Sequence, residues 1–191
     1  MRFNDGDTMR LYRQTIQDFG LYPGLEMSDE EFQRLQTAAG EMSAKMRAVR
    51  IVSASSISKR DLEQRLIHKG ENPEQAKQAV SWMSDLNLLD DRKTAEQIVH
   101  RCVSKGYGLA RAKQALYEKR IPKELWQEAL ADYPDQTDAI VAFLRARLGT
   151  SREEKELRKA MDALLRRGHS YSEIRAGLQQ LSLCDDFSEE Y

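Results

Sequence analysis

Cysteine, proline and long apolar runs are all scarce in this chain of 191 residues. No apolar stretch approaches the ~18–20 residues that a membrane span needs, and the opening residues MRFND lack the apolar core of a secretory signal. The two cysteines, Cys102 and Cys184, are far apart, and neither has a second Cys or His at metal-ligand spacing. We therefore expect a cytoplasmic protein with reduced thiols and without a membrane span, a disulfide or a metal site.

Catalytic groupings and phosphate-binding loops are also lacking. The three histidines are scattered, and no Ser/His/Asp, Cys/His or His/Glu constellation emerges. The glycines of residues 106–108 are too few for a phosphate-binding loop, which needs a longer glycine pattern and a following Lys-Ser/Thr. Asp90 and Asp91 could be metal ligands, but their place ahead of a predicted helix favours capping of that helix. We expect a protein that is not an enzyme and that needs no cofactor.

Signals that start and stop helices are abundant. Hydrophobic residues make up 40% of the chain and charged residues 32%, a profile typical of a soluble, helix-rich protein. In a capping box, a Ser hydroxyl and the Glu three residues later satisfy the first N–H groups of a helix. Such boxes begin at Ser28, Ser151 and Ser170. Glycines that follow a basic residue predict left-handed C-terminal caps at Gly70, Gly106 and Gly168.

The predicted helices, about ten in number, recur in groups of three. Leu66, Leu116 and Leu164 each precede a basic residue by three positions, and they are spaced by 50 and then 48 residues. A helix comes before each leucine-bearing helix, and a third helix follows it. The first helices are expected at 44–53, 92–105 and 137–147, and the third at 73–87, 122–132 and 171–182. A period of this length indicates an array of repeats that bury their apolar faces on one another.

We therefore expect an all-α fold of three tandem three-helix repeats, stacked into an elongated, curved molecule. A short extension, with a hairpin turned at residues 4–7 and a helix, precedes them. The expected boundaries are 1–43 for the extension, 44–91, 92–133 and 134–183 for the repeats, and 184–191 for an acidic tail.

Charge is distributed unevenly, although the net charge is only −1. Residues 1–43 hold 4 Lys/Arg and 8 Asp/Glu, residues 92–131 hold 9 and 4, and residues 145–175 hold 9 and 5. A basic middle between acidic ends indicates contact with nucleic acid or an acidic protein. Solvated helix faces with ion pairs such as Glu154–Arg158 are the alternative explanation.

The order of the motifs resembles the RecX family of regulatory proteins over about residues 15–182. The resemblance is carried by Leu88-Leu89-Asp90-Asp91, Lys105-Gly106-Tyr107-Gly108 and Lys119-Arg120-Ile121 in the second repeat. Ser58-Lys59-Arg60-Asp61-Leu62 in the first repeat and Arg166-Arg167-Gly168 in the third also fit. The chain departs from the family pattern in its turns. Leu109 stands where Pro is usual, Arg120 where Gly is usual, and Glu71 and His169 where an aromatic residue is common.

The resemblance implies a regulator of the RecA recombinase that lodges in the RecA–single-stranded DNA filament. Its expected effect is to inhibit filament assembly, ATPase and recombination activity in DNA repair and the SOS response. The RecA filament is the expected partner, with single- or double-stranded DNA as a second one, and we expect a monomer. The alternative is a helical-repeat nucleic-acid-binding module that acts without RecA.

Basic residues of the second and third repeats are the candidate contacts with RecA or DNA. Tyr107, between its two glycines, either packs between repeats or faces the partner. The candidate surface comprises Arg101, Lys105, Tyr107, Arg111, Lys113, Lys119, Arg120, Arg145, Arg147, Arg158, Arg166 and Arg167.

Overall fold

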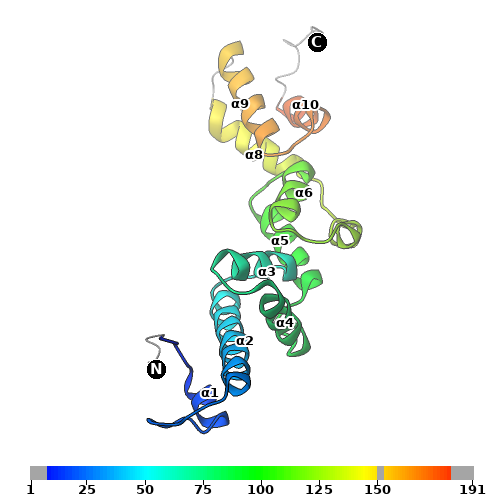
Figure 1. Ribbon diagram of the computed structural model, residues 1–191. Coiled ribbons are helices and arrows are strands. Elements are labelled where there is room, and N and C mark those ends of the chain that lie inside the picture. The colour runs from blue at the N-terminus through cyan, green and yellow to red at the C-terminus, as the bar shows by residue number, and fades with distance from the viewer. Residues whose placement is uncertain (1–7, 150–152, 182–191) are drawn as a thin grey trace. The chain divides into compact units, whose positions relative to one another are not determined.

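The computed structural model describes residues 8–149 and 153–181, and every regular element in these ranges is a helix (Figure 1). The chain forms two compact units, one up to Asp90 and one from Asp91 onward. The all-α prediction is therefore confirmed. The hairpin turn expected at residues 4–7 lies outside the described residues.

The described part of the first unit, residues 8–90, contains four helices. They are α1 (Arg13–Asp18), α2 (Asp29–Ala54), α3 (Lys59–His68) and α4 (Pro73–Asp85). The capping box at Ser28 is present, and Asn72 caps α4 with Pro73 in its first turn. None of the helices in the described ranges is both long and apolar enough to cross a membrane.

Helix α2 is continuous where the sequence suggested one helix in the extension and a second one from residue 44. No proline interrupts it, and its glycine has a packing role. A Cβ on Gly40 would lie 2.3 Å from Nε2 of Gln75 on α4, so the end of that side chain occupies the space beside the glycine. The extension and the first repeat therefore share one helix.

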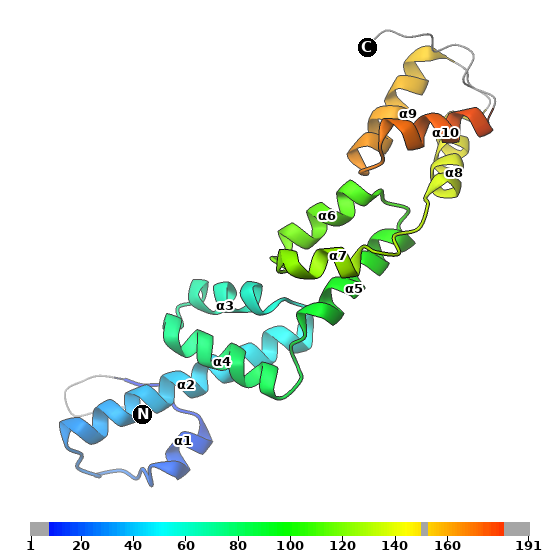
Figure 2. The same ribbon diagram turned by 90° about the vertical axis from the view of Figure 1, so that its right-hand side faces the viewer.

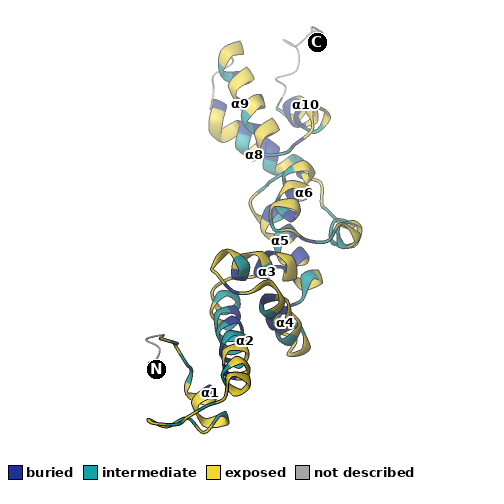
Figure 3. Cartoon of the chain, in the orientation of Figure 1, coloured by how far each residue is buried: buried dark blue, intermediate teal, exposed yellow. Residues whose placement is uncertain are grey.

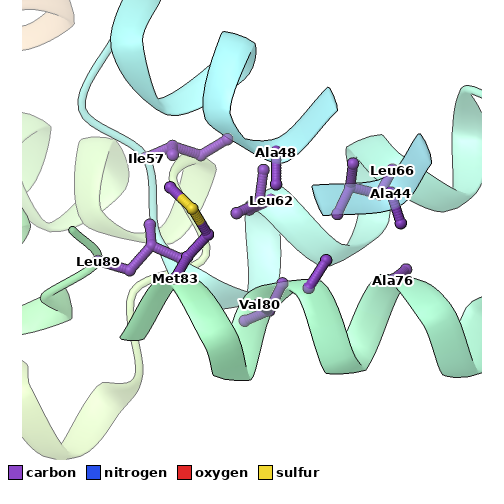
Figure 4. Close-up of a cluster of buried hydrophobic side chains, with 10 residues drawn as sticks. Ala44, Ala48, Ile57, Leu62, Leu66, Ala76, Val80, Met83 and Leu89 are labelled. Atoms are coloured by element: carbon purple, nitrogen blue, oxygen red, sulfur yellow. The ribbon is translucent and has the colours of Figure 1, made fainter. Parts of the chain in front are cut away.

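The core of the first unit lies among α2, α3 and α4 (Figure 4). Ala44 and Ala48 of α2 and Ala76 of α4 are fully buried, and such small side chains allow α2 and α4 to lie side by side (Figure 2). Leu62 and Leu66 fill the space beneath α3. Within each unit the helices turn their buried residues toward one another and leave their outer sides exposed (Figure 3).

The second unit holds the second and third repeats, each with its own apolar cluster. The second repeat consists of α5 (Asp91–Ser104), α6 (Leu109–Glu118), the 3-10 turn η1 (Lys123–Leu125) and α7 (Trp126–Ala129). The third consists of α8 (Thr137–Leu148), α9 (Glu154–Arg166) and α10 (Tyr171–Gln180).

Two boundaries in this unit differ from the prediction. The helix expected at 122–132 is only the 3-10 turn and the four residues of α7, and at the start of α7 the Trp126 indole donates to the Ile121 carbonyl oxygen at 3.0 Å. Helix α9 begins at Glu154 with Glu153 as its N-cap. The capping box expected at Ser151 therefore does not start α9, and Ser151 itself lies outside the described residues.

The predicted left-handed caps are confirmed at Gly70, Gly106 and Gly168, which have φ values of 89°, 62° and 86°. Arg120 takes the same conformation with a φ of 54°, at the position where glycine is usual in the resembling family. After each second helix, the N–H of the residue that follows the left-handed cap donates to the carbonyl oxygen of the repeated leucine: Glu71 to Leu66, Ile121 to Leu116 and His169 to Leu164. This is the Schellman closure of a helix.

The residue that follows each left-handed cap is buried. Glu71, Ile121 and His169 are 8%, 4% and 3% exposed, although one is acidic, one apolar and one a histidine. Glu71 accepts an ion pair from Arg47 at 2.6 Å and a hydrogen bond from the Ser43 hydroxyl. The three repeats therefore share the same backbone geometry, although the inward side chain is acidic in the first repeat, apolar in the second and a histidine in the third.

Backbone hydrogen bonds join the start of α6 to the turn after α9 within the second unit. The Gly108 N–H donates to the Arg167 carbonyl at 3.0 Å, and the Ala110 N–H donates to the Gly168 carbonyl at 3.2 Å. A Cβ on Gly108 would lie 2.0 Å from the Gly168 oxygen, and one on Gly168 would lie 2.3 Å from the Arg111 nitrogen. Both glycines are therefore required by contact of backbone with backbone.

His169 makes the third link of this joint. Its Nε2 lies 3.0 Å from the Gly106 carbonyl oxygen, which can only accept, so Nε2 carries the proton. Its Nδ1 is buried and has no hydrogen-bond partner in the described protein. Burial lowers the pKa of His169 and Arg167 lowers it further, against opposing effects of the Gly106 carbonyl and Glu173.

A pair of glycine substitutions separates backbone strain from the close approach of the two repeats. Gly70→Ala places a Cβ in open space and should reduce the free energy of unfolding by about 1 kcal/mol through φ strain alone. Gly168→Ala adds a collision with the Arg111 backbone and should cost about 2–3 kcal/mol more. Denaturant unfolding followed by circular dichroism measures both, and equal losses would contradict a tight joint.

The buried His169 predicts a stability change with pH. Because the pKa of His169 is lowered in the folded state, the unfolded chain binds a proton at His169 once the pH falls below about 6.5, whereas the folded chain does not yet bind it. The free energy of unfolding should therefore decrease from about pH 7.5 to about pH 5.5, and His169→Phe should show a smaller decrease. The variant keeps every other titrating group, so denaturant unfolding at both pH values isolates His169. Identical pH slopes would contradict the prediction.

Candidate partner-binding surface

Five of the predicted contact residues gather around the joint between the second and third repeats. We call this set the basic junction. It comprises Arg101, Lys105, Tyr107, Arg111 and Arg167, from α5, the turn after it, α6 and the end of α9. The buried thiol of Cys102 lies among three of them, since Arg111, Lys105 and Arg101 each lower its pKa while burial raises it more strongly. The fold therefore brings together basic side chains that are spread over 67 positions of the sequence, from Arg101 to Arg167.

Tyr107 lies at the centre of the basic junction and is half-buried. The Arg167 guanidinium carbon is 5.6 Å from the centroid of its ring, and the Lys105 amine is 6.0 Å from it. Arg167 also stacks on Phe143 at 4.9 Å. Of the two roles considered for Tyr107, packing between repeats is the one that the geometry displays. Arg167 belongs to this packing as well.

A tyrosine from the end of the second repeat holds this turn in place. The Tyr133 hydroxyl donates to the Tyr107 carbonyl oxygen at 2.7 Å. Burial raises the pKa of Tyr133 to about 12, so the phenol remains a neutral donor throughout the physiological range. The turn that carries the basic residues is consequently rigid at both its backbone and its central ring.

The other predicted residues are distributed over the helices of the second unit. Lys113 on α6 and Arg145 and Arg147 near the end of α8 are exposed, as is Arg166 in the last turn of α9. Lys119 and Arg120 form the turn after α6. These positions place basic side chains on the outer surface, away from the two apolar clusters.

Two of the predicted arginines form ion pairs within their own helices. Arg111 pairs with Glu118 at 2.9 Å, and Arg158 pairs with Glu154 on the exposed side of α9. The second pair is the one that the sequence offered as an ordinary solvated contact. Exposed pairs of this kind contribute ~0–1 kcal/mol to stability, and they leave part of each guanidinium accessible.

A second basic surface lies in the first unit, where the sequence interpretation selected no residue. It is a groove between α2 and α3 of about 420 Å³, lined by Arg47, Arg50, Ile51, Ala54, Ser55, Arg65 and Lys69. The signal was present in the sequence, since residues 44–70 hold seven Lys/Arg and two acids. The balance over the whole first repeat conceals it, because the acids concentrate after residue 70.

Comparison with known proteins agrees with this organisation. The family model described as "RecX, second three-helix domain" matches residues 90–130, which form the second repeat. The regulatory protein RecX of Vibrio campbellii is 29% identical over 150 residues, covering 77% of this chain and 96% of that protein. The regulatory protein RecX of Streptococcus gordonii is 25% identical over 190 residues, covering 97% of this chain and 74% of that protein.

Solved structures show the same fold. A crystal structure of regulatory protein RecX has a TM-score of 0.67 at 17% identity and covers 95% of this chain and 90% of its own. RecX from Lactobacillus salivarius has a TM-score of 0.66 at 22% identity, with coverage of 76% and 99%. Sequence relatives, the domain match and the shared fold agree with the motifs of all three repeats and support a RecX family protein.

Proposed function

We propose that this protein binds the filament that RecA forms on single-stranded DNA and inhibits its assembly, ATPase and recombinase activity. Similarity to regulatory proteins of the RecX family is the observation that carries the proposal. The choice of RecA as the target rests on the resemblance of the repeat motifs. The role is regulatory rather than enzymatic and belongs to DNA repair and the SOS response. The protein acts in the cytoplasm and as a monomer.

The basic junction is the proposed contact surface. Arg101 and Lys105 are its exposed members, while Tyr107, Tyr133 and the interlocked glycine turns fix the backbone that carries them. A rigid turn reduces the conformational entropy lost when its charged side chains bind a partner. The surface is therefore suited to either an acidic protein face or the phosphates of the filament's DNA, and both are components of the proposed target.

The RecA-dependent ATPase on single-stranded DNA tests this proposal directly. Stoichiometric protein should lower the ATPase rate and shorten filaments seen by electron microscopy. Arg101→Glu combined with Lys105→Glu should raise the concentration needed for half-inhibition by about tenfold, because two attractive charges become repulsive. Neither residue belongs to an apolar cluster, so the fold should be retained.

The matched control reverses two exposed lysines of the same unit outside the basic junction, Lys123→Glu with Lys155→Glu. It changes the net charge equally and should inhibit RecA nearly as well as the unmodified protein. An unchanged ATPase rate and filament length at stoichiometric protein would reject the proposal. The remaining candidate would then be a helical-repeat nucleic-acid-binding module that acts without RecA.

A further inference from the structure

The acidic tail expected at residues 184–191 has no part in the proposed function. It lies outside the described residues and follows the last of them, Leu181, after two positions. Its sequence, CDDFSEEY, holds four carboxylates and two aromatic rings but no Lys or Arg. The surface that complements such a segment is positively charged and partly apolar.

The joint between the second and third repeats brings together two segments that contain cations and no acid. Residues 97–117 hold four Lys/Arg and no Asp or Glu, and residues 163–172 hold two more arginines and again no acid. The hydrogen bonds from Gly108 and Ala110 to the carbonyls of Arg167 and Gly168 join the two segments. The basic junction is therefore a region where the chain supplies positive charge without neighbouring carboxylates.

Two of the acids that flank these segments already have partners near the joint. Glu118 pairs with Arg111 at 2.9 Å. Glu173 closes the capping box of α10 with Ser170. These two carboxylates are consequently not counterions for the exposed cations of either segment, whose charge is available to an acidic partner.

Exposed apolar side chains border the same joint. Leu109 opens α6, Leu165 lies in the last turn of α9 and Tyr171 opens α10, and these side chains are 37%, 45% and 51% exposed. A phosphate backbone has no apolar group to cover them. The rings of Phe187 and Tyr191 can do so, because they stand between and after the acids of the tail.

The chain that follows α10 is long enough to reach the joint. Helix α10 begins there, because His169 precedes its N-cap and places Nε2 3.0 Å from the Gly106 carbonyl oxygen. Its ten residues carry the chain about 15 Å away. Residues 182–191 can span up to about 33 Å, so their reach is about twice the distance that they need to return.

We infer that the acidic tail binds the basic junction, and the exposed leucines beside it, within the same molecule. The carboxylates of the tail then face Arg101, Lys105 and Arg166, and a partner of the basic junction must displace them. The tail is thus an autoinhibitory segment. The contact itself is independent of RecA, whereas its effect on RecA inhibition rests on the proposed function.

Carbodiimide cross-linking of the whole protein, without RecA, tests the contact. The reagent forms an amide between a carboxylate and a lysine amine that touch, and mass spectrometry identifies the linked peptides. Links from the tail to Lys105 should exceed those to Lys123 and Lys155, two exposed lysines of the same unit. They should disappear at about 0.5 M NaCl, where the Debye length falls to roughly 4 Å. Mixing isotope-labelled with unlabelled protein distinguishes links within a molecule from links between molecules.

Charge reversal around Lys105 sharpens this test. Arg101→Glu with Arg166→Glu keeps the reporter lysine and should lower the yield of its link to the tail by at least about fivefold, because attraction becomes repulsion. The matched control is Arg145→Glu with Arg147→Glu, two exposed residues of α8 outside the joint. It carries the same change in net charge and should leave the yield within about twofold. Unchanged circular dichroism spectra verify the folding of both variants.

Neutralising the tail tests autoinhibition in the RecA-dependent ATPase. The substitutions are Asp185→Asn, Asp186→Asn, Glu189→Gln and Glu190→Gln. If the tail covers the basic junction for about two thirds of the time, this variant should lower the concentration for half-inhibition by about threefold. The control neutralises four exposed acids elsewhere and should leave that concentration unchanged: Asp85→Asn, Glu124→Gln, Asp132→Asn and Asp162→Asn.

The two experiments separate this inference from the proposed function. Links spread evenly over the three lysines, or found only between molecules, would overturn the inference and leave the RecA proposal standing. A tail variant that inhibits RecA no better than its control would also overturn it. An intact link to Lys105, in a protein that leaves the RecA ATPase unchanged, would support the contact and reject the proposed function.

Discussion

A backbone hydrogen bond from the third residue after the helix closes the second helix of each repeat. It requires a left-handed residue at Gly70, Arg120 or Gly168, and it turns the next side chain inward. In the second unit, the cap of the third repeat also accepts two hydrogen bonds from the start of α6. The position of the basic turn, and so of every charged group near it, depends on this one closure.

Arg120 shows that the backbone geometry outweighs the residue's own preference. A non-glycine residue in the left-handed region is strained by ~1–2 kcal/mol, yet the turn after α6 keeps the same two hydrogen bonds as the glycine caps. The space around α6 requires no glycine there, in contrast to Gly168, whose missing Cβ admits the Arg111 backbone. The exception in the second repeat therefore follows from where the neighbouring repeat approaches.

Local signals in the sequence were sufficient for most of the helices. Ser28 and Ser170 accept the cap hydrogen bonds that their spacing predicts, and Ser58 and Asn72 cap α3 and α4 in the same way. The errors concern where helices begin and end. Helix α7 is only four residues long where the sequence suggested a helix over 122–132, and α2 runs without a break through residue 44. Gly40 of α2 lies against Gln75 of α4, and this contact between two helices cannot be read from residues that are neighbours in the chain.

The candidate surface was less predictable than the helices. Basic residue types identified Arg101, Lys105 and Arg111, but charge counts could not tell that Arg167 stacks between two aromatic rings. The groove of the first unit was missed because its four cations come from α2, α3 and the cap after α3, with Glu71 and Asp61 buried behind two of them. A net count treats such hidden carboxylates as equal to exposed ones, although only the cations face the solvent.

The continuity of α2 has a consequence for how the chain can be divided. At 26 residues it is about 39 Å long, and its only N-terminal cap is the Ser28 box far from the first repeat's core. A fragment cut at residue 44 would begin with four uncapped N–H groups, lose the Ser43–Glu71 hydrogen bond and lack part of the helix on which α4 packs. A stable fragment of this protein's first half should therefore keep the whole of α2 with its Ser28 cap, and not begin at the repeat boundary.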